Sequence, residues 1–344
     1  MLKLFLHISF KCFLLLVLLS VISTGIRVFL PFSWGSLQLN SKLKFIEEKN
    51  LDPNVYFLGS SVTNRQVRPT QFDSIIADDS LSSFNLSVDG TMPPHHFFLL
   101  EELLDSDKTV DYVFMELDGF DHMPPRHFLT TFSKFYFTPR WFCWSMSNLL
   151  FSKSIPFNQK LYMSYKYCRS FVENVFFIGM RYDALKSLLK KNAFSYRVLD
   201  KHKDGFMYFN TMFTENEIQS REKNKILNQT KQEFKAAYAL SPLELKSNFV
   251  YKALLKKYLH RAREKGIKLH YVITPRNSVL ISAEELIDIK NSFPDDIIMD
   301  MADPSVFGDL YDPTLRYDAD HLNDKGSILY TAYLSQKFLD SKNK

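Results

Sequence analysis

Five short runs with strand-like patterns recur along this 344-residue chain, and they limit its fold more than any other feature. A run such as Val55 to Leu58, which is apolar at every position, predicts a strand that is covered on both faces. Amphipathic helical patterns lie between most of the runs, and strands that alternate with helices pair in parallel. We therefore predict an α/β fold, a three-layer α/β/α sandwich with about five parallel strands. The predicted strands are residues 55–58, 82–88, 110–118, 268–275 and 296–303.

Three of these predicted strands end in turns of small or acidic residues. The turns read Gly59-Ser60-Ser61, Asp89-Gly90 and Asp118 to Asp121. In parallel α/β sheets, ligands bind outside the carboxyl ends of the strands. The three turns are therefore expected to converge on one crevice, which is where a functional site would lie.

The alternation of strands and helices breaks down between His122 and about Leu245. This long, mostly helical insertion contains the aromatic-rich stretch 132–151. The simpler interpretation is a helical cap with a small core of its own. A sharper interpretation is that four of its aromatic side chains rest on a membrane interface, namely Phe135, Phe137, Trp141 and Trp144.

The amino terminus carries the strongest compositional signal. Cys12 to Leu30 is almost entirely apolar, and a helix of these 19 residues spans about 28 Å, close to the hydrocarbon thickness of a bilayer. Lys3 and Lys11 lie before the apolar core. The positive-inside rule then predicts a cytoplasmic N-terminus and a body on the extracytoplasmic side, in the periplasm or at the cell surface. A cleaved signal peptide is the alternative, but no A-x-A-like site follows the apolar run, so we expect an uncleaved single-pass anchor.

These patterns divide the chain into four parts. The membrane anchor, residues 1–33, leads into a linker, residues 34–53. An α/β domain is expected to combine residues 54–121 with residues 245–344, and the insertion occupies residues 122–244.

Composition narrows the classes of function. Hydrophobic residues make up 46% of the chain, which is enough for a packed core. The net charge of +5 is modest, and no zinc finger, RNA-recognition signature or basic arm accompanies it, so no nucleic-acid partner is expected. Cys143 and Cys168 could pair only if the fold brings them together. No Cys/His spacing resembles a metal site, so neither a metal nor a cofactor is expected.

The Gly-Ser-Ser turn raises the question of a nucleophile. A serine hydroxyl is weakly nucleophilic until a positioned base takes its proton, and that base needs an orienting partner. The stretch YDADHLNDKG, residues 317–326, offers both. Asp318 precedes His321 by three residues, so a turn could fix the tautomer of the imidazole and leave its other nitrogen to face Ser61.

Taken together, these blocks resemble those of the SGNH/GDSL hydrolase superfamily. The similarity is greatest to its membrane-anchored, envelope-facing branch, which includes alginate O-acetyltransferase-like proteins. Gly59-Ser60-Ser61, Gly90 and Asp318-x-x-His321-Leu322-Asn323 stand in the family's order. The resemblance covers most of residues 54–120 and 245–340 and leaves the insertion unmatched.

This resemblance implies a flavodoxin-like sandwich and acyl-ester chemistry on carbohydrate or lipid substrates. Carried over by position, it makes Ser61 the nucleophile, His321 the general base and Asp318 the residue that orients the base. The backbone N–H groups of Ser61 and Gly90 would form the oxyanion hole.

One position departs from the family's pattern. The family's third block reads Gly-x-Asn-Asp, and its Asn side chain donates to the oxyanion, but this chain has Phe120 there. Losing one such donor typically lowers the rate roughly 10²–10³-fold. Three residues are candidates for a substitute donor, and the sequence does not choose among them: Asn64, Arg65 and Asn85.

Each block also has a plainer interpretation. A Gly-Ser-Ser at a strand end is usually just a turn. The Asp-Ala-Asp-His stretch can serve to start the last helix, with Asn323 or Asp324 as its N-cap. Asp320 competes with Asp318 as the residue that orients His321, although the family's spacing favours Asp318.

Two further pairs of residues lie near the predicted crevice. His95 and His96 lie at a helix start, where histidines more often cap the helix or face solvent. Glu116 and Asp118 are two apart on a strand and could form an acid/base pair, but a solvated strand end is the simpler interpretation.

The leading hypothesis is a serine-dependent esterase or transferase of O-acyl groups, with acetyl as the expected group. Its expected substrate is an acyl-bearing polysaccharide or glycolipid of the cell envelope, and an envelope biosynthesis complex is a candidate partner. The alternative is a non-catalytic SGNH-like protein that binds polysaccharide or scaffolds such a complex. A third hypothesis is a metal-dependent phosphoesterase that uses Asp118, Asp121 and Asp318.

Overall fold

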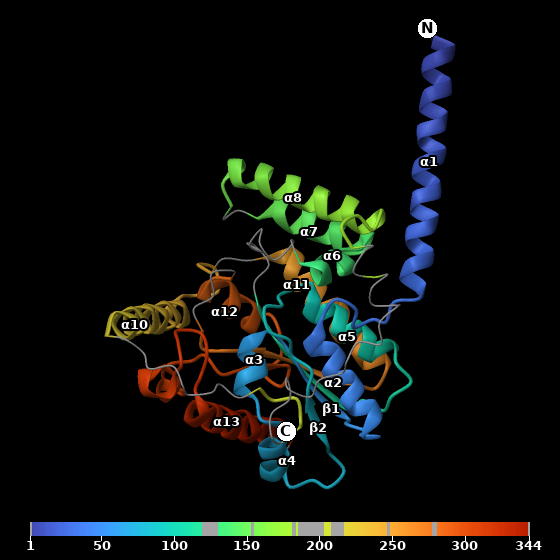
Figure 1. Cartoon of the computed structure of the whole chain (residues 1–344). Helices are drawn as coiled ribbons and strands as arrows, with labels where there is room; N and C mark the ends of the chain where they lie inside the picture. The colour runs from blue at the N-terminus through green and yellow to red at the C-terminus, as the bar shows by residue number, and fades with distance from the viewer. Residues whose placement is uncertain are drawn as a thin grey trace. The chain divides into compact units, whose positions relative to one another are not determined.

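A computed structural model of the chain describes residues 2–118, 130–152, 155–180, 184, 203–207, 217–245, 248–276 and 281–342 (Figure 1). The chain divides into two compact units. The anchor unit comprises residues 1–40 and 124–194, and the sheet unit comprises residues 41–123 and 195–344.

Five parallel strands form the centre of the sheet unit, in the spatial order β2-β1-β3-β4-β5. They are β1 (Val55–Leu58), β2 (Ser83–Asn85), β3 (Tyr112–Glu116), β4 (Lys268–Ile273) and β5 (Ile298–Asp300). The predicted α/β class and the parallel sheet are confirmed. The observed β2 and β5 are shorter than predicted, because regular pairing along each of them ends after three residues.

The helices of the sheet unit begin and end at recognisable signals. Pro69 opens α4, the Ser282–Glu285 capping box opens α12, and Gly266, at φ +75°, follows the end of α11. The helices of this unit are α3 (Ser61–Gln66), α4 (Pro69–Ile76), α5 (His95–Asp105), α10 (Glu217–Ala239), α11 (Phe249–Glu264), α12 (Ala283–Asn291) and α13 (Asp324–Lys342), with the short 3₁₀ helices η3 (Gly308–Tyr311) and η4 (Pro313–Leu315).

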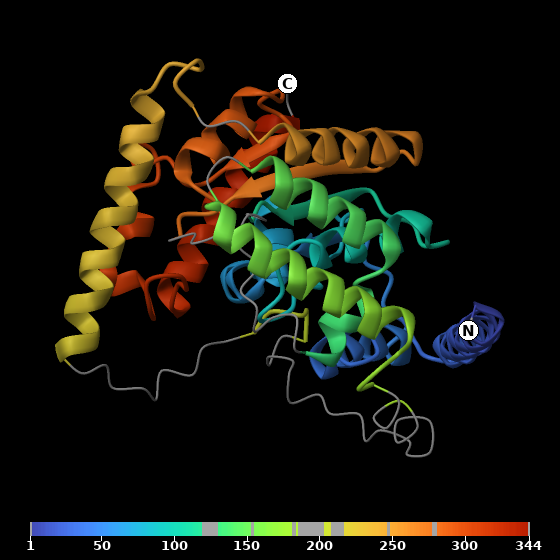
Figure 2. The same cartoon turned by 90° about the horizontal axis from the view of Figure 1, so that it is seen from above.

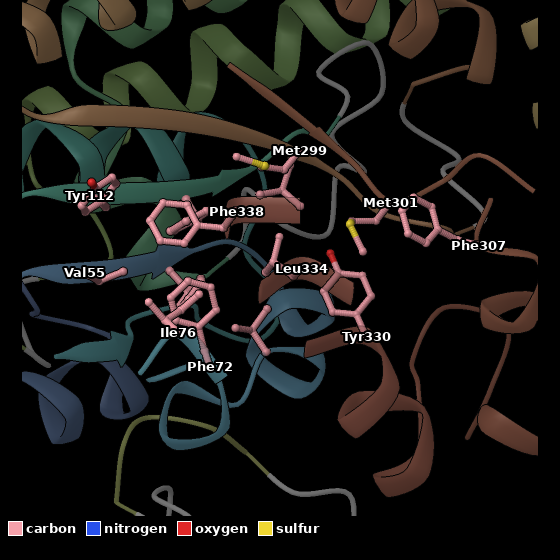
Figure 3. Close-up of a cluster of buried hydrophobic side chains, with 14 of the residues drawn as sticks. Val55, Phe72, Ile76, Tyr112, Met299, Met301, Phe307, Tyr330, Leu334 and Phe338 are labelled. Carbon is pink, nitrogen blue, oxygen red and sulfur yellow. The ribbon is translucent and has the colours of Figure 1, made fainter. Parts of the chain in front are cut away.

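One face of the sheet is covered by α4 and α13. Phe57 of β1 contacts Phe72 of α4, with ring centroids 5.1 Å apart, and Phe114 of β3 contacts Phe338 of α13 at 5.4 Å. Val55, Met299, Tyr330 and Leu334 belong to the same cluster of buried side chains, which Figure 3 shows between the strands and the helices.

Helices α5 and α11 lie against the opposite face. Phe97 of α5 contacts Tyr258 of α11 at 4.9 Å between centroids, and the hydroxyl of Tyr271 on β4 donates to the carbonyl of Leu255 at 2.7 Å. The wholly apolar strands are therefore buried on both sides, as their composition requires.

Two domain boundaries differ from the predicted ones. Residues 34–53, expected as a linker, contain the helix α2 (Leu37–Glu48), whose buried face includes Leu39, Lys42 and Ile46. The sequence did not predict this helix. Its buried face includes a lysine, Lys42, which interrupts the apolar pattern that would have indicated an amphipathic helix. Residues 195–244, expected within the insertion, group with the sheet unit, and α10 contacts α12 there.

The anchor unit contains α1 (Leu2–Val28), α6 (Thr131–Tyr136), α7 (Pro139–Phe151) and α8 (Phe157–Val175). Helices α7 and α8 lie side by side in both views (Figures 1 and 2). Lys3–Val28 of α1 is long and apolar enough to cross a membrane, and it is the one such helix in the part of the chain that the structure describes.

The four aromatic side chains proposed for a membrane interface do not share one environment. Phe137 and Trp141 are only 2% and 1% exposed, so the interfacial interpretation is wrong for these two. Phe137 instead contacts Tyr167 of α8, at 5.8 Å between centroids.

Cys143 and Cys168 are exposed and are not paired with each other.

Candidate active site

The turn after β1 presents two serines in succession. Gly59 ends the strand's run, and no side chain fits there, because a Cβ would lie 2.4 Å from Oε2 of Glu116 and 2.5 Å from Oγ1 of Thr63. Ser60 is the N-cap of α3, with its hydroxyl accepting from the N–H of Val62. Ser61 is the first residue of the helix and is partly exposed.

The structure brings Ser61 and His321 together, although 260 positions separate them. The Oγ of Ser61 lies 2.7 Å from Nε2 of His321. On the other side of the ring, Nδ1 lies 2.8 Å from Oδ2 and 2.9 Å from Oδ1 of Asp318. Because the carboxylate can only accept there, we assign the ring proton to Nδ1, which leaves Nε2 to accept from the serine hydroxyl.

The loop before α13 holds this histidine in place. Oδ1 of Asp318 accepts the N–H groups of Asp320 and His321, at 2.8 and 2.7 Å, so the carboxylate closes a tight turn while it faces the imidazole. Partial burial alone would raise the pKa of Asp318. The hydrogen bonds from His321 and these N–H groups outweigh it and lower the pKa.

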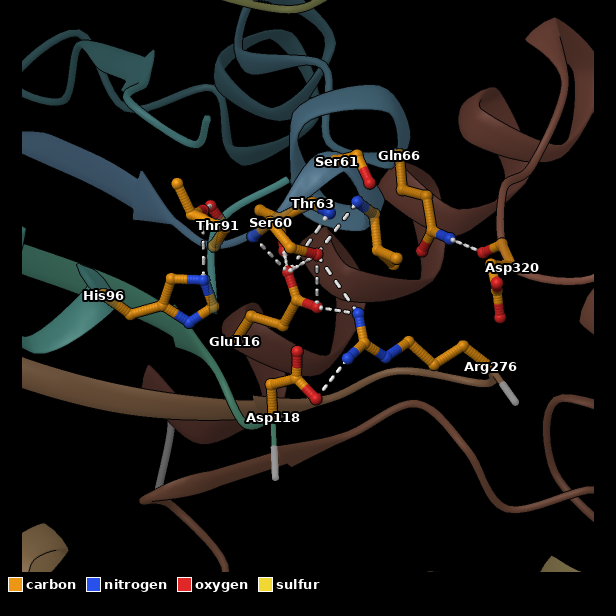
Figure 4. Close-up of polar contacts among 12 residues, drawn as sticks. Ser60, Ser61, Thr63, Gln66, Thr91, His96, Glu116, Asp118, Arg276 and Asp320 are labelled. Atoms are coloured by element: carbon orange, nitrogen blue, oxygen red, sulfur yellow. Dashed lines mark hydrogen bonds and ion pairs between the residues drawn. The ribbon is translucent and has the colours of Figure 1, made fainter. Parts of the chain in front are cut away.

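Asp320 does not orient the histidine. Its N–H donates to Asp318, and its carbonyl accepts from the side chain of Gln66 at 3.3 Å (Figure 4). Burial, aided by the charge of Asp318, raises the pKa of the Asp320 carboxyl. Of the two aspartates that the sequence left open, the structure places Asp318 on the imidazole.

A buried ionic cluster lies beneath the two serines, and Figure 4 shows its members pointing toward one another. Glu116, at the end of β3, accepts from the backbone N–H and the hydroxyl of Ser60, at 2.8 and 2.9 Å, and from the hydroxyl of Thr63 at 2.6 Å. Arg276, just after β4, forms ion pairs with Glu116, at 2.8 Å, and with Asp118. This cluster fixes the first turn of α3 to the ends of two strands.

The electrostatics of the cluster favour the charged forms. Burial would raise the pKa of Glu116, but Arg276 together with the hydrogen bonds lowers it. Burial would lower the pKa of Arg276, but the carboxylates of Asp118 and Glu116 raise it. The prediction of a solvated strand end is therefore wrong, because Glu116 and Asp118 are each only 1% exposed. Nor are they positioned as an acid/base pair, since one arginine holds both.

The segment after β2 brings Gly90 near the Gly59-Ser60-Ser61 turn. The N–H of Val88 donates to the carbonyl of Gly59 at 3.1 Å, and the hydroxyl of Thr91 donates to the same carbonyl at 3.1 Å. Gly90 lies between these two contacts at φ +71°, a conformation that favours glycine. Ser61, as the first residue of α3, has an N–H without an acceptor inside the helix. Both predicted oxyanion donors thus lie around one turn, and their role stays a prediction.

The three candidates for a substitute oxyanion donor are engaged elsewhere. Asn85 uses its amide hydrogens on the carbonyls of Thr63 and Val67, both at 3.0 Å. Asn64 donates to Asp89 at 2.7 Å, and Arg65 forms an ion pair with the same carboxylate. Phe120, at the position of the family's Asn, lies outside the described residues.

Lys42 of α2 is a buried cation that sequence reasoning missed. Its ammonium donates to Oδ1 of Asn64 at 2.7 Å and to the carbonyls of Asn85 and Ser87 at 2.8 and 2.7 Å. Burial lowers its pKa to about 7, although Asp89 opposes the shift. Its contacts join α2 to α3 and to the segment that leads to Gly90. No local pattern predicts the burial of Lys42, because it lies within residues 34–53, which the sequence indicates as a linker.

The two histidines at the start of α5 are buried, so of the two expected roles, capping the helix or facing solvent, the second is wrong. Nδ1 of His95 lies 2.9 Å from the carbonyl of Met92, and Nε2 of His96 lies 3.4 Å from the hydroxyl of Thr91. Burial lowers the pKa of His96, against the attraction of Glu116. The buried imidazole of His96, on α5, therefore lies close to Glu116 of the ionic cluster.

The two described residues of the phosphoesterase hypothesis are held by different partners. Asp118 is held by Arg276 and Asp318 by His321, while Asp121 lies outside the described residues. Among the residues that the structure describes, no group of three or more His, Cys, Asp or Glu side chains could hold a metal ion.

Comparisons with models of protein families, with curated proteins and with solved structures found no match for this chain.

Proposed function

We propose that this protein is a serine-dependent O-acyl esterase or transferase of the SGNH/GDSL type. The observation that supports it most is the 2.7 Å contact between Oγ of Ser61 and Nε2 of His321, with Asp318 on the opposite ring nitrogen. A hydroxyl, an imidazole and a carboxylate in this order form the arrangement that activates a serine for attack on an ester.

In the proposed reaction, His321 takes the proton of Ser61 as Oγ attacks the carbonyl carbon of the acyl ester. The carbonyl oxygen becomes an oxyanion, which the N–H groups of Ser61 and Gly90 stabilise. The intermediate collapses as His321 returns the proton to the leaving alcohol, and an acyl group remains on Ser61. Water or a sugar hydroxyl then gives its proton to His321 as it attacks the acyl carbon. His321 returns that proton to Oγ of Ser61 as the bond between Oγ and the acyl carbon breaks. Water completes an esterase cycle, and the sugar completes a transferase cycle.

The arrangement of the chain suits this proposal. The strand order β2-β1-β3-β4-β5 is that of flavodoxin-like sheets, whose ligands bind at the carboxyl ends of the strands. Ser61 follows the end of β1, and Glu116 ends β3. We accordingly propose a three-layer sandwich that carries the site at one edge, with α6 to α8 as part of a helical insertion.

The proposed substrate is an acyl ester, with acetyl as the first choice, on a polysaccharide or glycoconjugate of the cell envelope. Helix α1 supports this location, because Lys3 and Lys11 at its start favour a cytoplasmic N-terminus. The sheet unit would then face the extracytoplasmic side.

Turnover of an activated acetyl ester, such as p-nitrophenyl acetate, by the full chain in detergent tests the proposal. We expect Ser61→Ala and His321→Ala each to lower kcat/KM on the order of 10⁵-fold. Ser74→Ala on the exposed side of α4 and His260→Ala on α11 should leave it unchanged, because both side chains are exposed and neither belongs to the site. Equal turnover in all four variants would refute the mechanism and favour a binding or scaffolding protein.

A further inference from the structure

Helix α8 carries an apolar stripe on its surface whose large apolar side chains are exposed among the residues that the structure describes. Its buried side includes Met163 and Tyr167. The outer stripe recurs every three or four residues, so its members share one face of the helix, and it comprises Phe157, Leu161, Tyr165, Cys168 and Val172. Phe157 is 75% exposed, Leu161 58% and Tyr165 59%, so the stripe is not packed into the core of the anchor unit.

The end of α7 extends this apolar surface. Leu150 and Phe151 are 57% and 61% exposed. The ammonium of Lys160 on α8 donates to the carbonyls of Leu150 and Ser152, at 2.9 and 2.6 Å, and so fixes this helix end beside the start of α8. Soluble proteins rarely expose continuous apolar surface of this kind unless it binds something.

Cationic side chains flank the stripe. Lys166 lies over the rings of Tyr162 and Tyr165, with its ammonium 5.2 and 5.8 Å from their centroids. By helical spacing, Lys160 lies on one side of the stripe, and Lys166 and Arg169 lie on the other. The nearby carboxylate of Glu173 is neutralised by Arg169, at 2.8 Å, and by Lys134, at 2.6 Å. Apolar side chains between cations suit the headgroup region of a bilayer with anionic lipids.

The anchor helix ends where α8 ends. Arg27, in the last turn of α1, lies over the rings of Phe135 and Phe177, 5.6 and 5.9 Å from their centroids. Leu30 and Trp34, just after α1, share a buried cluster with Phe177, which follows α8 by two residues. Helix α1 is seen lengthwise in Figure 1 and nearly end-on in Figure 2, whereas α8 is seen lengthwise in both. Within the anchor unit, the axis of α8 therefore runs across the axis of α1.

We infer that the outer stripe of α8 is a second membrane contact, lying in the headgroup region of the bilayer that α1 crosses. The inference rests on the membrane crossing of α1 and is independent of the proposed enzymatic activity. A second copy of the chain or a partner protein could also cover an apolar stripe, but the tie between α8 and the end of α1 favours lipid. The membrane then contacts residues other than Phe137 and Trp141, which are buried.

The chain's own cysteines provide the test, because Cys12 lies in α1 and Cys168 lies in the stripe, both exposed. Full-length variants C143S/C168S and C12S/C143S each keep one of them for labelling with the fluorophore NBD. The labelled proteins are reconstituted in vesicles of phosphatidylcholine and phosphatidylglycerol that contain lipids with a doxyl quencher at a shallow or a deep acyl position.

We expect the probe at Cys12 to be quenched most by the deep quencher and the probe at Cys168 most by the shallow one, with both protected from aqueous iodide. If iodide reaches Cys168 as it reaches free dye, the stripe faces water and the inference is wrong. If Cys168 is protected from iodide but not quenched by either lipid, protein covers the stripe, which also overturns it. A probe at Cys12 that no lipid quenches would remove the premise that α1 is inserted.

A charge in the stripe sharpens the result. We expect Leu161→Glu in the C12S/C143S background to remove most of the shallow quenching at Cys168, while Gln159→Glu leaves it unchanged. Both side chains are exposed on α8, but Gln159 lies off the stripe. Equal quenching in the two variants would show that α8 does not depend on its apolar stripe for membrane contact.

Discussion

Ser60 and Ser61 are neighbours in the chain, but their hydroxyls have opposite surroundings. Ser60 is buried and is held by the charged pair of Glu116 and Arg276. Ser61 is partly exposed and faces the imidazole of His321. One serine is surrounded by groups that fix it, and the other by a group that can take its proton. Residue type alone does not assign a role, because the role depends on the partner and on access to solvent.

The same difference separates the carboxylates. Asp318, beside the imidazole, keeps 45% of its side chain exposed, whereas Glu116 has none exposed. Glu116 and Asp118 share one arginine, which holds both carboxylates in the buried cluster. The buried cluster thus positions the turn, and the loop before α13 supplies the imidazole that faces Ser61 and the carboxylate that faces the imidazole.

The largest expected effect separates the two aspartates of that loop. Asp318→Asn should lower kcat/KM for an acetyl ester by roughly 10⁴-fold, because an amide can hold the imidazole in the wrong tautomer. Asp320→Asn, which leaves the imidazole's partner in place, should change it by less than about tenfold. Steady-state kinetics of the two variants give the answer, and similar losses in both would remove the distinction between these residues.

Breaking the buried cluster should instead cost stability. Arg276→Met leaves Glu116 and Asp118 buried without their counter-ion, so we expect a loss of about 3–5 kcal/mol in the free energy of unfolding. Arg261→Met, which breaks a more exposed ion pair with Asp105, should cost at most about 1 kcal/mol. Urea denaturation of the full chain measures both, and equal losses would show that the cluster is no more important than a surface pair.

A smaller effect concerns the pH dependence of stability. The pKa of Lys42 is lowered by burial to about 7 from an ordinary value of 10.5. The unfolded chain therefore binds more protons between these values, so the contribution of Lys42 to the unfolding free energy rises as the pH increases from about 7 to about 10. Lys42→Met should lack this rise, and Lys256→Met on the exposed face of α11 should keep it. The midpoint of urea denaturation, measured across this pH range, tests the prediction. If the midpoints of the wild type and of Lys42→Met change equally with pH, the burial of a titrating lysine is contradicted.

The parts of the fold that could be predicted are those with local signals. Short strand-like runs marked the five strands, and the Gly-Ser-Ser and Asp-x-x-His blocks marked the three residues that lie in contact. These signals succeed because the strand pattern and the turn chemistry depend on residues near in sequence.

The residues that could not be predicted are those whose surroundings come from distant segments. In the sequence, Glu116 and Asp118 have the pattern of a solvated strand end. In the fold both form ion pairs with Arg276, which is 160 positions from Glu116. Lys42 looks like a linker lysine until the segments after β1 and β2 supply its acceptors. Burial of charged groups is set by tertiary packing, and no short window of sequence contains that information.

The central claim is that Ser61, and not its neighbour, is the nucleophile. The most direct test is to label the folded, full-length protein with a fluorophosphonate and to locate the adduct by peptide mass spectrometry. We predict an adduct on Ser61, none on Ser60, and loss of the adduct in His321→Ala. An unlabelled Ser61 in the folded wild type, or a label that persists without the imidazole, would contradict the account.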